Sequence, residues 1–254
     1  MAGAMVQGWR SAGIDFSGVT VIRPSGIAVE GIQTVTSYPD ENPRFVMLGF
    51  KPQKLDEIAP ELAAHVDGRT TVVSMLAGVT AASLRERFPG AGAVIRVMPN
   101  LPVAQVQGVT AIYSDDGNIE RFADVRQLMA SLGMIVWCEA EAELGVVGAV
   151  ASAGIAYVAR FADALSSSGE ALGLRSGLAG QVAIQTLVGT AAYAADTGAS
   201  MAEIARRVAS PKGTTEQGLA VLDAADGLQP LVERTLAAAV RRGQELAADA
   251  ARRD

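Results

Sequence analysis

Short apolar segments alternate with helix-like segments through the first half of the chain. The expected strands are rich in β-branched residues and have Gly, Pro or Asp nearby. They cover residues 19–23, 45–50, 71–76, 93–98, 109–113 and 134–138. Between them, apolar residues such as Leu55, Ile58 and Leu62 recur every three or four positions, which is the spacing of one buried helical face. This alternation predicts an α/β layer structure with a mostly parallel sheet.

The second half predicts helices alone. They are expected over residues 142–168, 176–197, 201–209, 214–225 and 229–251. The segment 178–195 is apolar almost all round, including Val182, Ile184, Leu187 and Val188, so it must be enclosed on every side. We therefore predict two domains, residues 1–140 and 141–254, and an obligate homo-oligomer whose helices interleave. A self-contained helical bundle is the alternative.

Composition narrows the class of protein. The chain has 254 residues, of which 50% are hydrophobic and 19% charged, and its formal net charge is −6. Scattered basic residues and a negative charge argue against a nucleic-acid partner. The single cysteine excludes an intramolecular disulfide, and neither a cationic leader nor a long apolar run precedes the fold. We expect a cytoplasmic protein with no membrane partner and no metal site.

Two motifs carry candidate chemistry. Asn100 lies in Arg-Val-Met-Pro-Asn-Leu-Pro (residues 96–102), where two prolines fix the exit from a strand and the amide offers a donor and an acceptor. Residues 210–219, Ser-Pro-Lys-Gly-Thr-Thr-Glu-Gln-Gly-Leu, are typical of a helix N-terminus, where free N–H groups and two hydroxyls could hold an anion. Each motif also has a purely structural interpretation. Asn100 could bond its own backbone in a rigid turn, and the threonine could cap a helix without binding a ligand.

Together these motifs resemble those of pyrroline-5-carboxylate reductase, the NAD(P)H-dependent enzyme that makes proline. The resemblance covers nearly the whole chain and implies a Rossmann-type domain followed by an all-α dimerisation domain. It also implies a cyclic imino acid substrate, NADP or NAD as cofactor, and a homodimer or larger homo-oligomer. By the same resemblance, Thr215 is the catalytic donor beside the imine nitrogen. The implied substrate-binding residues are Ser210, Gly213, Thr214 and Thr215.

The resemblance further implies a cofactor site at the ends of the strands. Ala2 would take the third Gly/Ala position of the phosphate-binding turn, and Gly78 would let the backbone approach the nicotinamide. Arg23 stands where an acidic residue would bind the ribose of NAD, so it favours NADP. The full set of implied cofactor-binding residues is Met1, Ala2, Arg23, Lys51, Pro52, Ala77, Gly78 and Asn100. His65, the single histidine, is expected on a surface helix and leaves no histidine as general acid.

The sequence departs from this pattern in two regions. It opens inside the first Rossmann helix, without the usual first strand and its two glycines, so we expect a truncated or wrongly started chain whose neighbouring strands have unpaired backbone groups. A short native form with a rearranged sheet is the alternative. In residues 149–157, Ala151 and Ala153 replace two serines of the family's helix opening. The alternatives are therefore a catalytically impaired, nucleotide- or amino-acid-binding dimer and a reductase of another cyclic imine.

Overall fold

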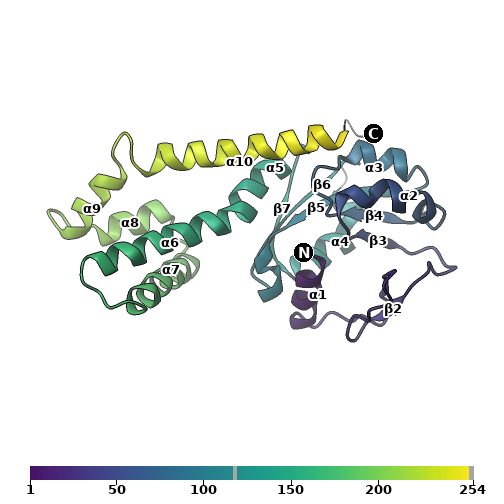
Figure 1. Ribbon diagram of the computed structural model, residues 1–254, viewed down its shortest axis with the longest axis horizontal. Coiled ribbons are helices and arrows are strands. Elements are labelled where there is room, and N and C mark those ends of the chain that lie inside the picture. Colours follow the sequence, from purple (N-terminus) through teal and green to yellow (C-terminus); the bar gives the residue numbers. More distant parts are fainter. Residues whose placement is uncertain (117–118, 252–254) are drawn as a thin grey trace. The chain divides into compact units, whose positions relative to one another are not determined.

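The computed structural model describes residues 1–116 and 119–251 and divides into two compact units (Figure 1). The first unit contains Met1–Ser152 and the chain from Val240 onward, and the second contains Ala153–Ala239. The division thus follows residue 152, whereas the sequence predicts a domain boundary after residue 140.

The first unit is built on a five-stranded sheet. Its strands, in spatial order, are β3 (Phe45–Leu48), β4 (Thr71–Ser74), β5 (Ala93–Pro99), β6 (Gly108–Ser114) and β7 (Gly133–Trp137). The strands β3, β4 and β5 are parallel, β6 is antiparallel to β5, and β7 is parallel to β6. A separate sheet contains β1 (Thr20–Ile22) and β2 (Gln33–Val35), which are parallel. All six predicted strands are confirmed, and β2 is an additional one.

The separation of the two sheets has a simple topological meaning. The strands of a Rossmann sheet lie in the spatial order 3-2-1-4-5-6. Here β2 and β1 correspond to Rossmann strands 3 and 2, and β3, β4 and β5 correspond to Rossmann strands 4, 5 and 6. The break between the sheets therefore falls at the position of the first strand. Within the described part of the chain, β1 and β3 each pair with a strand on one side only, as expected from the sequence.

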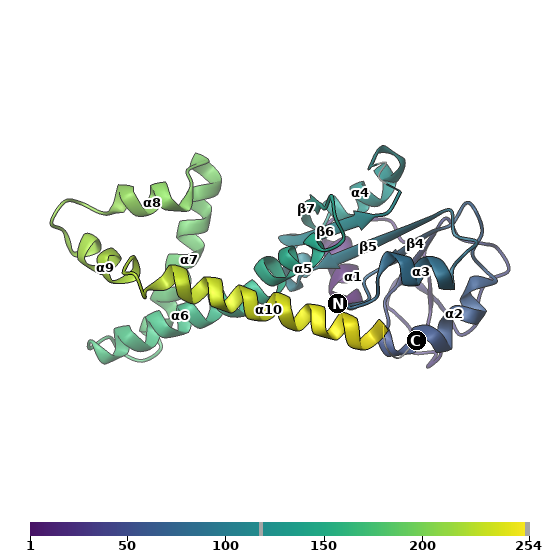
Figure 2. The same ribbon diagram turned by 90° about the horizontal axis from the view of Figure 1, so that it is seen from above.

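Helices cover both faces of the larger sheet (Figure 2). They are α1 (Ala2–Ser11), α2 (Leu55–Ala63), α3 (Ala81–Arg87) and α4 (Ala123–Ala130). Because neighbouring strand residues point to opposite faces, Val72 and Val94 pack with α2 and α3, while Val73 and Ile95 pack with α1 and α4. Each face thus has its own apolar core.

A long helical run links the two units. It comprises α5 (Glu143–Val147), a π-helical segment (Gly148–Ala153) and α6 (Gly154–Ala171). The predicted helix over residues 142–168 is confirmed, but the π-helical segment was not expected. By length and hydropathy this run, Glu143–Ala171, could span a membrane, a test that core helices of soluble proteins also pass.

The second unit is helical, as predicted. Besides α6 it contains α7 (Leu178–Thr197), α8 (Met201–Val208), α9 (Thr214–Leu222) and the beginning of α10 (Leu228–Ala251). The expectation that residues 178–195 are enclosed on every side is not met within one chain, because Ile184 is 62% exposed and only Ala179 and Ala183 of α7 are buried. The apolar surface of α7 needs a partner outside the single chain.

The location predicted for His65 is wrong. It lies in the turn after α2, not on a helix, because the helix ends at Ala63. Its ring is half-buried and stacks on Tyr38, with the ring centroids 4.9 Å apart. This residue therefore has a packing role.

Candidate active site

The implied cofactor-binding residues of the larger sheet lie at one edge. Since β3, β4 and β5 are parallel, their carboxyl ends share that edge. Lys51 and Pro52 follow β3, Ala77 and Gly78 follow β4, and Asn100 follows β5. The structure therefore places these five residues in the loops where doubly wound sheets bind their ligands.

The start of α1 lies beside the end of β3. A Cβ atom added to Gly49 would be 3.2 Å from the Cβ of Ala2, so these two positions are in close contact. Met1 is the N-cap of α1 and provides no side-chain cap. The first N–H groups of α1 are therefore available to an anion such as a phosphate.

Arg23 lies at the carboxyl end of β1, in the separate two-stranded sheet. Its side chain is exposed, and its guanidinium donates a hydrogen bond to Ile27 O at 3.3 Å. Strand pairing thus does not join Arg23 to the loops that follow β3, β4 and β5.

The turn between β4 and α3 is shaped for close approach. Gly78 has a φ of +79°, a conformation that glycine adopts without strain. Ser74 Oγ accepts a hydrogen bond from the N–H of Leu76 at 3.2 Å, and Thr80 caps α3 by accepting one from the N–H of Ser83 at 3.1 Å. The turn is therefore held at both ends, and the small residues Ala77 and Gly78 between them leave its backbone accessible.

Asn100 is buried and its amide is fully engaged with the chain. Its Oδ1 accepts a hydrogen bond from Val109 N–H at 2.8 Å, and its Nδ2 donates one to Ala151 O at 2.9 Å. The side chain thus ties the end of β5 to the start of β6 and to the π-helical segment. In this structure Asn100 fixes the shape of the edge, and its bonding partners are distant in sequence.

The π-helical segment coincides with the region where the sequence departs most from the reductase pattern. A π turn leaves a backbone carbonyl outside the ordinary helical ladder, and such turns are frequent at functional sites. Asn100 supplies a donor to one of these carbonyls, that of Ala151. A Cβ on Gly148 would lie 2.4 Å from Met98 Sδ, so this segment packs tightly against β5.

The turn that precedes α9 belongs to the second unit. Lys212 has a φ of +59°, and Gly213 donates a hydrogen bond to Ser210 O at 2.9 Å. A Cβ on Gly213 would be 2.9 Å from the backbone O of Ser210 and 2.3 Å from its Oγ, so the turn leaves little room for a side chain there. Thr214 and Thr215 begin α9, whose N-cap, Gly213, has no side chain to offer.

This turn has the features of an anion site. Among the described residues, the hydroxyls of Thr214 and Thr215 make no hydrogen bond, and Thr215 is half-buried. Free N–H groups and the helix dipole both favour a negative group at this position. The carboxylate of Glu216 would compete with a bound anion at this turn. Its Oε2 accepts a hydrogen bond from Lys212 N–H at 2.7 Å.

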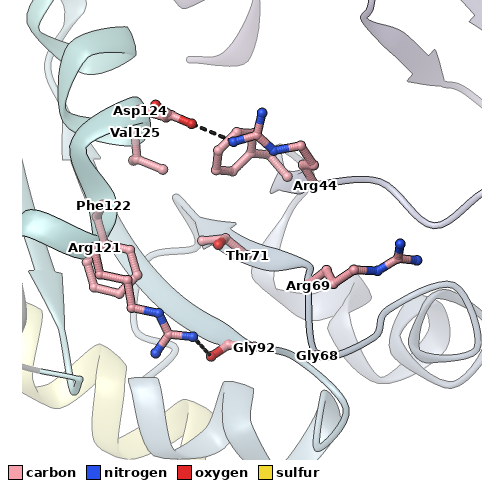
Figure 3. A pocket seen from close by; sticks show the side chains of 10 residues that line it. Arg44, Gly68, Arg69, Thr71, Gly92, Arg121, Phe122, Asp124 and Val125 are labelled. Atoms are coloured by element: carbon pink, nitrogen blue, oxygen red, sulfur yellow. Dashed lines mark hydrogen bonds and ion pairs between the residues drawn. The ribbon is translucent and has the colours of Figure 1, made fainter.

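A cavity lies at the opposite edge of the larger sheet (Figure 3). Its volume is about 280 Å³, and it lies near the amino ends of β3, β4 and β5. Its three arginines already have acidic partners, so an added anion would gain little there. The pairs are Arg44–Asp124, Arg69–Asp67 and Arg121–Asp116. The carboxyl edge is the stronger candidate.

Other reactive groups give no competing site. Cys138 is buried, and burial raises the pKa of its thiol, with Glu143 adding to the effect. A thiol held protonated in this way is a poor nucleophile. Within residues 1–116 and 119–251, no cluster of three or more His, Cys, Asp or Glu side chains is arranged to hold a metal ion.

Comparison with known proteins identifies the family. The model of the pyrroline-5-carboxylate reductase dimerisation domain matches residues 141–246. A pyrroline-5-carboxylate reductase of Pseudomonas aeruginosa is 32% identical over 256 residues, which cover 97% of this chain and 93% of that protein. The chain belongs to the pyrroline-5-carboxylate reductase family. A second member, from Synechocystis, is 36% identical over 202 residues, covering 79% of this chain and 74% of that protein.

Solved structures of pyrroline-5-carboxylate reductases have the same fold. The enzyme from Coxiella burnetii superposes with a TM-score of 0.87 at 27% identity, covering 96% of this chain and 94% of that one. The Plasmodium falciparum protein, whose structure has NADP bound, gives a TM-score of 0.79 at 20% identity and covers 96% of this chain and 94% of its own. The Rossmann-type sheet followed by a helical dimerisation domain is thus the architecture of this reductase family.

Proposed function

We propose that this chain reduces 1-pyrroline-5-carboxylate to L-proline with a nicotinamide cofactor. The observation that carries the proposal is the start of α9, where Thr214 and Thr215 stand in the first turn of a helix without a side-chain cap. In a chain 32% identical to a reductase over almost its full length, this is the expected carboxylate-binding turn.

The residues at the carboxyl edge fit a nicotinamide dinucleotide. The open N-terminus of α1 suits a phosphate, Lys51 supplies a nearby positive charge, and Gly78 lets the backbone reach a flat ring. When bound, the cofactor supplies the hydride for the imine carbon. We propose NADP as the preferred form, because Arg23 at the end of β1 could receive a 2′-phosphate.

The chain's own residues would bind and orient the substrate. Free N–H groups at Thr214 and Thr215 hold the carboxylate, together with the hydroxyl of Ser210, and Gly213 lets the turn close. Thr215 Oγ1 would lie beside the imine nitrogen as a hydrogen-bond donor. Because a neutral hydroxyl is a weak acid, we assign it the orientation of the ring and the relay of a proton.

A strand between β1 and β3 belongs to the proposed cofactor site. The edges of β1 and β3 are open on the side where the Rossmann order has its first strand, and α1, which would follow that strand, already lies against Gly49. We therefore propose that a strand at this position would complete the cofactor domain, residues 1–140. A version extended by a strand and a glycine loop should bind the cofactor more tightly than the 254-residue chain.

A second candidate function follows from the helix opening. Ala151 and Ala153 stand where the family has serines, so two hydroxyls are lost near the substrate. Such losses cost about 1 kcal/mol each and would either impair turnover or change the preferred ring. A binding protein without activity and a reductase of another cyclic imine are therefore the alternatives. We further propose a cytoplasmic homodimer or higher homo-oligomer.

The decisive assay is oxidation of NADPH with pyrroline-5-carboxylate, run on the 254-residue chain and on the extended version. Turnover by either protein supports the reductase proposal, and turnover by the extended version alone supports the strand as well. Activity only with a cyclic imine of larger ring would favour the alternative that the protein is a reductase of another cyclic imine. No turnover by either protein, with cofactor binding retained, would favour the binding protein.

Thr215→Ala tests the residue expected at the imine. We expect kcat to fall by at least about tenfold, because the loss acts where charge develops during reduction. Thr215→Ser should recover most of it, and Thr214→Ala should chiefly raise KM for the imino acid. Circular dichroism checks that the fold is intact. Unchanged turnover in Thr215→Ala would remove this hydroxyl from the site.

A further inference from the structure

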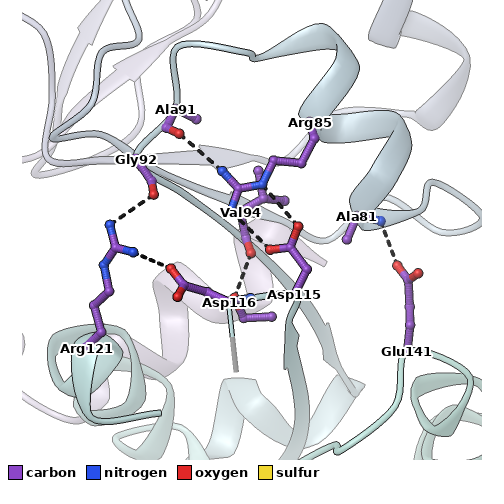
Figure 4. Close-up of polar contacts among 10 residues, drawn as sticks. Ala81, Arg85, Ala91, Gly92, Val94, Asp115, Asp116, Arg121 and Glu141 are labelled. Carbon is purple, nitrogen blue, oxygen red and sulfur yellow. Dashed lines mark hydrogen bonds and ion pairs between the residues drawn. The ribbon is translucent and has the colours of Figure 1, made fainter. Parts of the chain in front are cut away.

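Glu141 occupies an unusual position between three elements. It precedes α5, and its Oε1 accepts a hydrogen bond from the backbone N–H of Ala81 at 2.7 Å (Figure 4). The same oxygen accepts a hydrogen bond from Arg96 Nη1 at 2.8 Å. The side chains of Arg96 and Glu141 are 11% and 28% exposed, so the ion pair is largely shielded from water. One carboxylate oxygen therefore joins the start of α3 to the middle of β5.

The bond to Ala81 falls on a helix end that needs acceptors. Ala81 is the first residue of α3, and its N–H is one of those without a partner inside the helix. The side chain of the cap residue Thr80 already accepts a hydrogen bond from the N–H of Ser83 and does not reach that of Ala81. A carboxylate at this point makes a charge-assisted hydrogen bond and also interacts favourably with the helix dipole.

The bond to Arg96 fixes where that carboxylate stands. Arg96 lies within β5, in register with Ser74 on β4 and Tyr113 on β6, so its backbone is held on both sides. Ser74 is also the last residue of β4 before the turn that leads to α3. The Arg96–Glu141–Ala81 connection therefore spans this turn from its strand side to its helix side.

The turn has few hydrogen bonds of its own, although Leu76 and Val79 are buried in the apolar core. Gly78 adopts a positive φ, and the hydrogen bond from Val79 N–H to Leu76 O is long, at 3.4 Å. Hydrogen bonds that hold its ends add to this packing and limit local opening of the segment. Ser74 holds one end through Leu76, and Glu141 holds the other through Ala81.

We propose that Glu141 is a positioning residue for the cofactor, because it holds the turn from Met75 to Thr80 in the shape that receives the nicotinamide. The cofactor part of this inference rests on the proposed function of the carboxyl edge. The conformational part concerns the unliganded protein alone. The two parts can therefore be tested separately.

The test uses three variants of the full chain. Glu141→Ala removes the acceptor, Glu141→Gln keeps an oxygen for Ala81 but removes the charge, and Glu143→Ala is the matched control. Glu143 is a neighbouring exposed carboxylate, and among the described residues its side chain accepts a single hydrogen bond, from the N–H of Glu139 at 3.0 Å. Hydrogen exchange over residues 75–82 is measured without ligand, and NADPH affinity is measured by fluorescence titration of the same proteins.

The expected results separate a positioning role from a general loss of stability. Glu141→Ala should speed exchange in residues 75–82 at least about fivefold and weaken NADPH binding about tenfold, while Glu141→Gln should recover most of both. In the active protein, KM for NADPH should rise and KM for the imino acid should stay the same. The control should match the unmodified chain in every readout.

Specific outcomes would overturn the inference. Unchanged exchange in Glu141→Ala would mean that this carboxylate does not hold the turn. Equal defects in Glu141→Ala and Glu141→Gln would assign the effect to the charge on Arg96 and not to the bond with Ala81. If exchange responds as expected but the unmodified chain and its extended version bind neither NADPH nor NADH, the turn is held as inferred and the proposed function fails.

Discussion

Lys212 and Glu216 show how single residues tune the proposed substrate turn. Lys212 is a non-glycine residue with a positive φ, which carries a cost of about 1 kcal/mol. Its N–H is held by the Glu216 carboxylate at 2.7 Å. A resident negative charge thus occupies the same helix N-terminus that would receive the substrate's carboxylate, and the two anions repel each other.

Glu216→Gln should therefore improve substrate binding. We expect KM for pyrroline-5-carboxylate to fall about two- to fivefold, with little change in kcat. The effect is this small because the Glu216 carboxylate is exposed and its charge is screened by water and salt. The gain should shrink as salt concentration rises. Glu203→Gln on α8, which removes a carboxylate paired with Arg207, is the control. A KM that is unchanged or higher would place the substrate's carboxylate elsewhere.

At the residue scale, the sequence predicted positions better than contacts. Lys51, Gly78 and Asn100 could be placed together because parallel strands end at one edge. The partners of Asn100 could not be predicted, since Val109 and Ala151 are 9 and 51 residues away. Glu141 was missed for the same reason: Ala81 is 60 residues from it, and no local motif marks the bond.

At the scale of elements, the strands could be predicted because each is a short apolar run with turn residues at its ends. The strand β2 was missed, since its residues Gln33 and Thr34 are polar and form no apolar run. The antiparallel direction of β6 follows from its connection, because residues 100–107 are too few for a crossover between parallel strands. The π-helical segment gives no sequence signal, since its apolar pattern equals that of an α-helix.

The packing of α1 provides a test between matched glycines. A Cβ on Gly8 would lie 2.0 Å from Val103 O and 2.8 Å from Leu132 Cδ2, whereas one on Gly3 would have nothing within 4 Å. We expect Gly8→Ala to lower the free energy of unfolding by about 3 kcal/mol, because the backbone of Val103, in the short helix after β5, must move. Gly3→Ala should raise it by up to about 1 kcal/mol.

Urea unfolding monitored by tryptophan fluorescence measures both changes, because Trp9 lies in the same helix and its indole donates a hydrogen bond to Leu128 O at 3.0 Å. Equal effects of the two substitutions would show that α1 does not pack here through its glycine. The test thus asks whether α1 packs closely against Val103 and Leu132 at Gly8.

At the scale of the whole molecule, the exposed apolar surface of the second unit is its main feature. On α6, Val158, Phe161 and Leu165 follow one helical face and are 54%, 43% and 45% exposed. On α7, Ile184 and Val188 are 62% and 55% exposed. A monomer in water seldom leaves such a surface open, and residues 141–246 match a dimerisation domain.

We therefore expect sedimentation velocity to find no folded monomer at micromolar concentration. Phe161→Glu combined with Ile184→Glu should produce monomers with loosened helices, because each charge would be buried without a partner in the assembly. Ile27→Glu, at a residue of the first unit that is 60% exposed, should leave the assembly unchanged. A stable, fully helical monomer of the unmodified chain would show that α6 and α7 are compatible with water. The second unit would then be the self-contained bundle that the sequence left as the alternative.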